Sequence, residues 1–202
     1  PRPWRDVNTM TVSFGHGVAV TPLHAVSGYA TLVNGGIKHN PTLLLRSAED
    51  AVATGTRVIS AETSEIMRGL LYLVVAEGTG KQAQVDGYLV GGKTGTAEKP
   101  RDGGYARKAL LSTFIATFPI DAPRYAVLIS LDEPQGNEAT HGFASAGWTA
   151  APTTGQVINR IGPMLGIAPL TSPTFSPGRE AIPLPPTNIV RTGIRSNEIA
   201  TF

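Results

Sequence analysis

The segment VGGKTGTAEK, at residues 90–99, decides which fold and which chemistry this chain can carry. Within ten residues it places one glycine-flanked ammonium group, two hydroxyl groups and four glycine or alanine positions. Glycines allow another backbone to come close, and hydroxyls beside an ammonium group suit a carboxylate or a phosphate. The choice between these two anions depends on whether a strand or a helix carries Lys93.

The phosphate interpretation rests on the P-loop pattern, which residues 87–94 match as GYLVGGKT. Residues 127–133, VLISLDE, also imitate the acidic strand that holds magnesium in such enzymes. The physical context disagrees, because residues 80–86 do not read as the strand that must precede a P-loop. Gly95 and Pro100 also disfavour the helix whose N-terminus would bind the phosphate. A nucleotide-binding P-loop therefore stays only a remote alternative.

The carboxylate interpretation requires a strand, and the chain offers three in succession. We interpret as strands the segments 88–97, 112–118 and 125–131. A polar connection at 100–108 and a tight turn at 121–124 join them. Links this short make neighbouring strands antiparallel, because a parallel pair needs a crossover of a dozen or more residues. The sequence therefore predicts a three-stranded antiparallel meander.

On a strand the side chains alternate, so Lys93 and Gly95 would face one side while Thr94 and Thr96 face the other. At a sheet edge, an extended peptide can add itself as one more strand, and Gly95 would let that peptide come close. A threonine hydroxyl can hold a terminal carboxylate, and a main-chain N–H can point at a developing oxyanion. The chemistry indicated is acyl transfer on a peptide with a free carboxylate.

Helices are expected on both sides of these strands, which makes the fold class α+β. Thr21-Pro22 opens a helix that ends at Gly35-Gly36. Ser60 is the expected N-cap of a strongly apolar helix that stops at Gly78, and a last helix begins near Pro152, with Pro163 expected to kink or interrupt it.

The remaining segments receive simpler interpretations. Residues 1–20 are expected to be loop with short extended pieces, 42–45 a short strand and 46–57 an irregular connection. We divide the chain into one domain at 1–168 and a proline-rich extended tail at 169–202.

The composition excludes several classes of function. The 202 residues carry a formal net charge of +2 without a run of Lys and Arg, so no nucleic acid is expected as a partner. There is no cysteine, and His24, His39 and His141 lack metal-ligand spacing, so neither a metal nor another cofactor is expected. The sequence contains no run of about 18 apolar residues, so it predicts no membrane span.

Lys93-Thr94-Gly95-Thr96 resembles the third motif of the serine acyl-transferases that include penicillin-binding proteins and class A β-lactamases. Three flanking segments resemble class B penicillin-binding proteins in the same order: FGHGVAVTPL at 14–23, VAEGTG at 75–80 and FIATFP at 114–119. Within that family the chain is most similar to the division-type peptidoglycan D,D-transpeptidase of Gram-negative bacteria. The resemblance covers about residues 10–166.

The resemblance implies a serine β-lactamase-like fold, an antiparallel sheet flanked by helices, that is incomplete in this chain. It assigns a proton shuttle and carboxylate attraction to Lys93, carboxylate contacts to Thr94 and Thr96, and half of the oxyanion hole to the Thr96 N–H. The implied substrate is the D-Ala-D-Ala end of a peptidoglycan stem peptide, which β-lactam antibiotics would mimic. The implied role is septal cell-wall synthesis with divisome proteins, at the periplasmic face of the inner membrane, with the anchor in an N-terminal segment.

The family's other two motifs, Ser-x-x-Lys and Ser-x-Asn, do not occur in the 202 residues. We therefore expect the C-terminal part of a transpeptidase domain, whose partner is the missing N-terminal half, and no activity from the isolated chain because no nucleophile is present. One alternative stays open, a non-catalytic interaction module of the divisome that keeps the fold.

Overall fold

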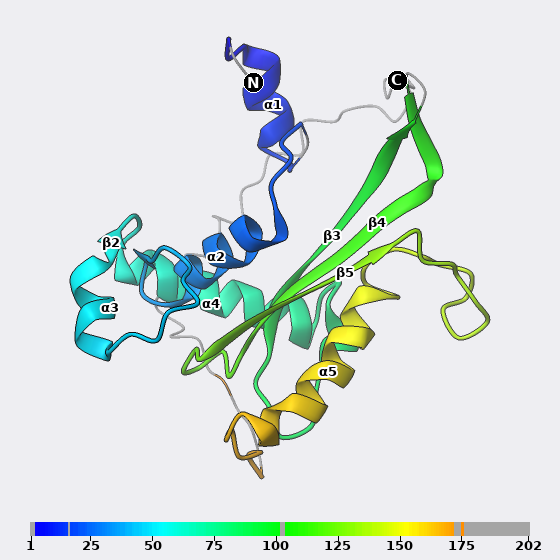
Figure 1. Ribbon diagram of the computed structural model, residues 1–202. Helices are drawn as coiled ribbons and strands as arrows, with labels where there is room; N and C mark the ends of the chain where they lie inside the picture. The colour runs from blue at the N-terminus through cyan, green and yellow to red at the C-terminus, as the bar shows by residue number, and fades with distance from the viewer. Residues whose placement is uncertain (1–2, 16, 102–103, 172–174, 176–202) are drawn as a thin grey trace, which may run out of the picture.

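The computed structural model describes residues 3–15, 17–101, 104–171 and 175, and it contains the predicted meander. Strands β3 (Gly91–Arg101), β4 (Gly104–Phe118) and β5 (Tyr125–Asp132) form one antiparallel sheet in the order β3-β4-β5 (Figure 1). Strand β3 is therefore an edge strand of this sheet, as the interpretation of the KTGT segment requires.

The boundaries of β3 and β4 differ from the predicted ones. Residues 88–90 precede β3, and the backbone N–H of Ile120 donates to the Leu89 carbonyl at 2.9 Å. The polar segment 100–108, predicted as a connection, instead continues both strands as a long hairpin. Backbone hydrogen bonding between strands does not depend on the polarity of the side chains, so a polar segment can continue a hairpin. Salt bridges from Lys99 to Asp132 (2.7 Å) and Glu133 (3.0 Å) connect the base of this hairpin to the end of β5.

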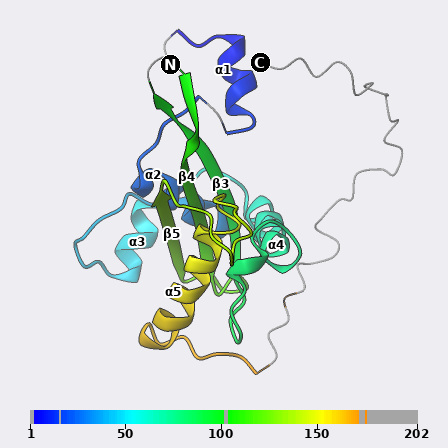
Figure 2. The ribbon, with the colours of Figure 1, turned by 90° about the vertical axis from the view of Figure 1, so that its right-hand side faces the viewer.

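Helices cover both faces of the sheet. Helix α5 (Ala150–Met164) packs on one face, where Phe114 and Phe118 join Ile158 in one hydrophobic cluster. Helices α2 (Pro22–Val33) and α4 (Ala61–Ala76) lie on the other side, where a second cluster contains Tyr29, Leu71 and Ile120. Figure 2 shows α5 in front of the sheet, α2 behind it and α4 beside β3. The predicted α+β class is confirmed.

Two of the predicted helix starts, those of α2 and α4, are confirmed by their caps. The Thr21 hydroxyl accepts from the His24 N–H (3.2 Å), and the Ser60 hydroxyl accepts from the Thr63 N–H (3.0 Å). Not every apolar residue of these helices is buried, since Leu23 in α2 and Leu70 in α4 are exposed. Pro163 lies one residue before the end of α5, so it does not interrupt this helix.

Three short elements were not expected from the sequence. Residues 1–20 contain helix α1 (Asp6–Val12), and residues 46–57 contain α3 (Ala48–Thr54), whose N-cap Ser47 accepts from the Asp50 N–H at 3.1 Å. A 3-10 turn, η1, covers Lys81–Ala83.

The strand predicted at 42–45 is wrong. Leu43 and Leu45 are fully exposed, and the short antiparallel pair forms instead between β1 (Ile37–Lys38) and β2 (Thr56–Arg57). This pairing is favoured because the Asn34 side chain fixes the backbone of Ile37. Asn34 Nδ2–H donates to the Ile37 carbonyl (2.7 Å), and Asn34 Oδ1 accepts from the Ile37 N–H (2.9 Å).

Most of the predicted tail at 169–202 lies outside the described residues. Its first part returns along the domain, since the Leu170 N–H donates to the Gly87 carbonyl at 2.8 Å and the Phe175 ring meets Tyr72 edge to face at 5.2 Å. Within the described ranges, none of the helices has the length and apolar character needed to cross a bilayer.

Candidate active site

The register of β3 against β4 fixes which face each residue of the KTGT segment occupies. Thr94 and Thr96 pair with the buried residues Phe114 and Ser112, so they lie on the sheet face that α5 covers. Lys93 pairs with Ile115, which packs against the second cluster, so Lys93 lies on the opposite face. The side chains of residues 93–96 therefore alternate between the two faces of the sheet, as the sequence predicts.

Thr94 and Thr96 line one cavity of about 420 Å³ at the edge of the sheet. Its other walls come from the turn after α4, through Thr79, and from the loop before α5, through Ser145 and Trp148. Hydroxyl groups therefore converge on the cavity from three separate segments of the chain. None of the described residues that line it carries a carboxylate, which favours an anionic ligand.

The hydrogen bonds of the two threonines leave them ready to donate. The Thr96 hydroxyl oxygen accepts from the backbone N–H of Ala146 at 3.0 Å, so its own proton is free for a ligand oxygen. The Thr94 and Thr79 hydroxyl oxygens are 3.0 Å apart. When Thr79 donates in that pair, the Thr94 proton is free as well. Thr94 and Thr96 lie two residues apart on the same face of β3, so their two O–H donors can hold the two oxygens of a carboxylate.

Gly95 leaves open space over the strand. A Cβ atom built on Gly95 would have only the Thr113 carbonyl within 4 Å, at 3.9 Å. By contrast, a Cβ on Gly92 would come within 2.5 Å of the Phe114 ring, and one on Gly147 within 2.8 Å of the Thr79 carbonyl. Gly92 and Gly147 therefore serve close packing, whereas Gly95 gives a ligand access to the backbone.

Lys93 does not line the cavity that holds the threonines. Its side chain is exposed, and its Nζ atom donates to the Thr94 carbonyl at 2.9 Å. The structure thus brings Thr94 and Thr96 together and places the ammonium group across the strand from them. A group that uses Lys93 must approach from the face of the sheet on which α2 lies.

Sequence reasoning missed the two groups that form hydrogen bonds with Thr94 and Thr96. Thr79 lies in the VAEGTG segment, where its position between two glycines was a usable signal. The Ala146 N–H carries no signal in the sequence, because a backbone donor 50 residues from Thr96 becomes visible only when the loop before α5 is folded.

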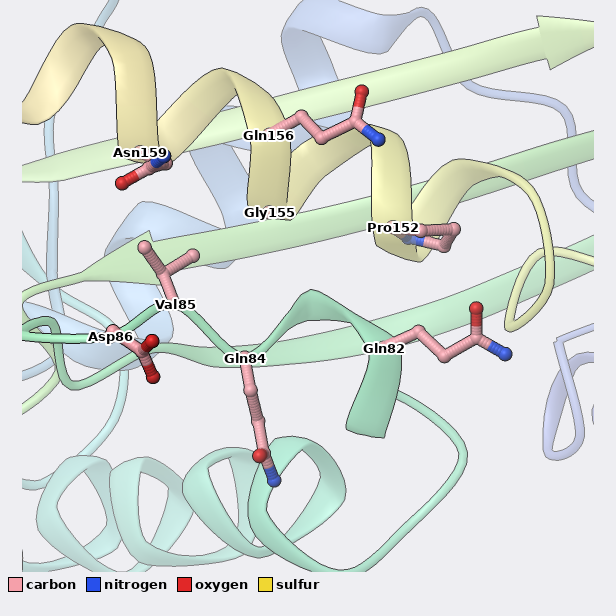
Figure 3. Close-up of a pocket in the computed structure, with 8 residues that line it drawn as sticks. All are labelled: Gln82, Gln84, Val85, Asp86, Pro152, Gly155, Gln156 and Asn159. Carbon is pink, nitrogen blue, oxygen red and sulfur yellow. The ribbon is translucent and has the colours of Figure 1, made fainter.

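A second, more polar groove lies next to the site. It has a volume of about 350 Å³ and runs between residues 82–86 and α5, as Figure 3 shows. Gln82 lines both this groove and the site cavity. Gln84 is held in place, since its side-chain N–H groups donate to the carbonyls of Val75 and Ala76, both at 3.0 Å.

The geometry removes the basis of the nucleotide interpretation. Lys93 lies inside β3, which continues to Arg101, so a strand and not the phosphate-binding helix of a P-loop follows the lysine. The acids at the end of β5, Asp132 and Glu133, are bound to Lys99, and hydrogen bonding to Asp132 and then Glu133 raises the Lys99 pKa. Among the described residues, no group of three or more potential ligands could hold a metal ion.

The profile of the penicillin-binding protein transpeptidase domain matches residues 1–153. The chain belongs to this family. It is 42% identical over 176 residues to the probable peptidoglycan D,D-transpeptidase FtsI of Caulobacter vibrioides, covering 83% of this chain and 30% of the relative. It is 39% identical over 173 residues to the stage V sporulation protein D of Bacillus subtilis, covering 81% of this chain and 26% of that one. The chain thus spans less than a third of the length of these two relatives.

Solved transpeptidase domains share the fold. The transpeptidase domain of Burkholderia pseudomallei penicillin-binding protein 3 superposes with a TM-score of 0.72 at 31% identity, covering 85% of this chain and 50% of that one. Penicillin-binding protein 3 of Mycobacterium tuberculosis, solved with ampicillin, gives a TM-score of 0.68 at 26% identity, covering 85% and 41%. The expected family and the expected transpeptidase fold are both confirmed.

Proposed function

We propose that this penicillin-binding transpeptidase segment supplies the carboxylate-binding wall of a peptidoglycan D,D-transpeptidase. The proposal rests on the Thr96 hydroxyl. Its oxygen accepts from the Ala146 N–H at 3.0 Å, so its proton is free to bind a ligand. With Thr94 beside it on the same cavity, this donor suits the terminal carboxylate of a stem peptide that ends in D-Ala-D-Ala.

In this mechanism the peptide lies along the exposed edge of β3 as an additional strand. A serine from a segment outside this chain attacks the carbonyl carbon between the two D-alanines, the C–N bond breaks, and the terminal D-Ala leaves with a proton on its nitrogen. The amine of a second stem peptide then attacks the ester and releases the serine. The Thr96 N–H would be one donor to the oxyanion of each tetrahedral intermediate.

Lys93 would serve the proton transfers from the other face of the strand. Because its side chain is exposed and lies across from the threonines, the segment that carries the serine must pack on this face, near α2. The ammonium group would also attract the substrate carboxylate electrostatically.

The proposed setting is septal cell-wall synthesis at the periplasmic face of the inner membrane, with divisome proteins as partners. The FtsI relative supports this setting by its name, although the sporulation relative shows that similar segments belong to proteins of another developmental context. Inhibition by β-lactams is supported by the related structure solved with ampicillin.

The test is covalent labelling of the complete protein with a fluorescent penicillin. We expect one stable adduct per molecule, and a Lys93→Ala variant that labels at least about a hundredfold more slowly while its circular dichroism spectrum is unchanged. If a folded complete protein formed no adduct, the proposed transpeptidase activity would be refuted, and a non-catalytic divisome module would explain the chain better.

A further inference from the structure

A separate pocket lies on the far side of α2 from the sheet edge that carries the KTGT segment. Its volume is about 460 Å³, within the range of ordinary small-molecule sites. One wall is α2, and the other is formed by β1 with the residues after it and by Val58 and Ile59 after β2. None of these residues lines the cavity that holds Thr94 and Thr96.

The polar groups of this pocket are cationic or neutral. Lys38, His39 and His24 line it together with Ser27 and Asn40, and its lining includes no aspartate or glutamate from the part of the chain that the structure describes. The side chains of Lys38, His39 and Asn40 have no hydrogen-bond partner among the described residues. The ammonium group of Lys38 makes the potential inside positive, and the donors of Lys38, His39 and Asn40 are available to a ligand.

The wall opposite α2 is fixed in place, so the pocket exists before any ligand arrives. Buried Ser64 in α4 donates to the Leu32 carbonyl (2.6 Å) and accepts from the Gly35 N–H (3.0 Å), which ties α4 to the end of α2. The Arg57 guanidinium donates to the carbonyls of Gly35 (2.8 Å) and Ile59 (3.2 Å), which ties β2 to the same point. A preformed site spends little binding free energy on ordering.

The floor of the pocket is apolar and has room. Leu32 and Ile59 are half-buried at its base, and Gly28 interrupts the surface of α2 between them and His24. A Cβ atom built on Gly28 would meet no heavy atom within 4 Å. The space above this glycine can hold an apolar group.

We propose that this pocket binds a small amphiphilic anion, with its carboxylate or phosphate group at Lys38 and His39 and its apolar body over Gly28 against Leu32 and Ile59. This site would act apart from the transpeptidase chemistry, because it shares no residue with the cavity of the threonines. The juxtaposition of three unpaired donors with an apolar floor defines the ligand class.

The test compares three probes by isothermal titration calorimetry on the purified protein at pH 7: 1-naphthyl phosphate, 1-naphthol and inorganic phosphate. We expect 1-naphthyl phosphate to bind at least about tenfold more tightly than either of the others, because only this probe uses both parts of the pocket. Equal affinity of 1-naphthyl phosphate and 1-naphthol would overturn the anionic part, and equal affinity of 1-naphthyl phosphate and inorganic phosphate would overturn the apolar part.

Variants locate the binding. Gly28→Leu fills the space over α2 and should abolish binding of 1-naphthyl phosphate, whereas Gly28→Ala, whose methyl group meets nothing, should leave it within about twofold. Lys38→Gln should weaken this probe about tenfold and leave 1-naphthol unchanged, while Arg160→Gln, at an exposed position of α5, is the matched control for loss of a positive charge. Undiminished binding in Gly28→Leu refutes the location; should that variant not fold, undiminished binding in Lys38→Gln does so.

Discussion

Replacement of Thr96 by valine tests the carboxylate-binding wall most directly. Valine keeps the branched shape on the strand and removes only the hydroxyl, whose oxygen accepts from the Ala146 N–H at 3.0 Å and whose proton we assign to the ligand carboxylate. A hydrogen bond to a charged group contributes about 1.5–3 kcal/mol. The second-order rate of acylation by benzylpenicillin should therefore fall about 10- to 150-fold.

The assay is stopped-flow or gel-based acylation of the complete protein, with two controls. Thr96→Ser keeps the hydroxyl and should stay within about threefold of the unchanged protein. The methyl ester of benzylpenicillin has no carboxylate, so the unchanged protein and Thr96→Val should acylate with it at nearly the same low rate.

The ester also separates binding chemistry from structural damage. Loss of the Thr96 oxygen leaves the Ala146 N–H without its acceptor, and a displaced loop before α5 would slow both penicillins alike. If Thr96→Val lowered the rate equally with the acid and the ester, or not at all with the acid, the assignment of the carboxylate to this hydroxyl would be wrong.

Three further predictions concern the scaffold. Ser64→Ala should lower the free energy of unfolding by about 2 kcal/mol in urea titrations, since it leaves two partly buried backbone groups, the Leu32 carbonyl and the Gly35 N–H, without their partner. Ser60→Ala, at an exposed cap, should cost only about 1 kcal/mol. Tyr29→Phe should raise it by about 1 kcal/mol, because the buried Tyr29 hydroxyl has no partner among the described residues. Burial raises the Tyr29 pKa, so the unchanged protein should lose stability as the pH rises above about 10, where only the unfolded phenol ionises, and Tyr29→Phe should lose less over the same range. Lys99→Met should speed amide hydrogen exchange at the base of the β3–β4 hairpin with little change in global stability, because its ion pairs are exposed; an unchanged exchange rate would show that they do not hold the hairpin.

Local signals in the sequence were sufficient for the sheet and the main helices. The turn at 121–124 and the caps Thr21 and Ser60 act over three or four residues, and the structure follows them. The alternation along β3 was equally local, so the faces of Lys93 and Thr94 were predictable. These features require only the neighbouring residues and the period of a strand.

Features that depend on distant partners were not predictable. The extension of the hairpin through 100–108 depends on pairing between β3 and β4, and the polarity of the segment gave no sign of it. The strand predicted at 42–45 was wrong because a short apolar run does not show by itself whether other residues cover it, and Leu43 and Leu45 are exposed. The Ala146 donor at Thr96 belongs to the same class, since a backbone N–H has no residue type.

The register shift in the hairpin separates the site from changes in chain length. Glu98 pairs with Leu110, but Lys99 pairs with Ala106, so the extra residues of β4 are taken up just beyond the KTGT segment. Insertions or deletions beyond this register shift, toward the tip of the β3–β4 hairpin, can change the length of this arm of the hairpin while Lys93 and Thr96 stay on their faces of the sheet. One residue inserted between Gly92 and Lys93 would instead exchange those faces, moving the ammonium group into the cavity and both hydroxyls out of it. Length variation in this arm is thus compatible with an intact site, whereas length variation before Lys93 is not.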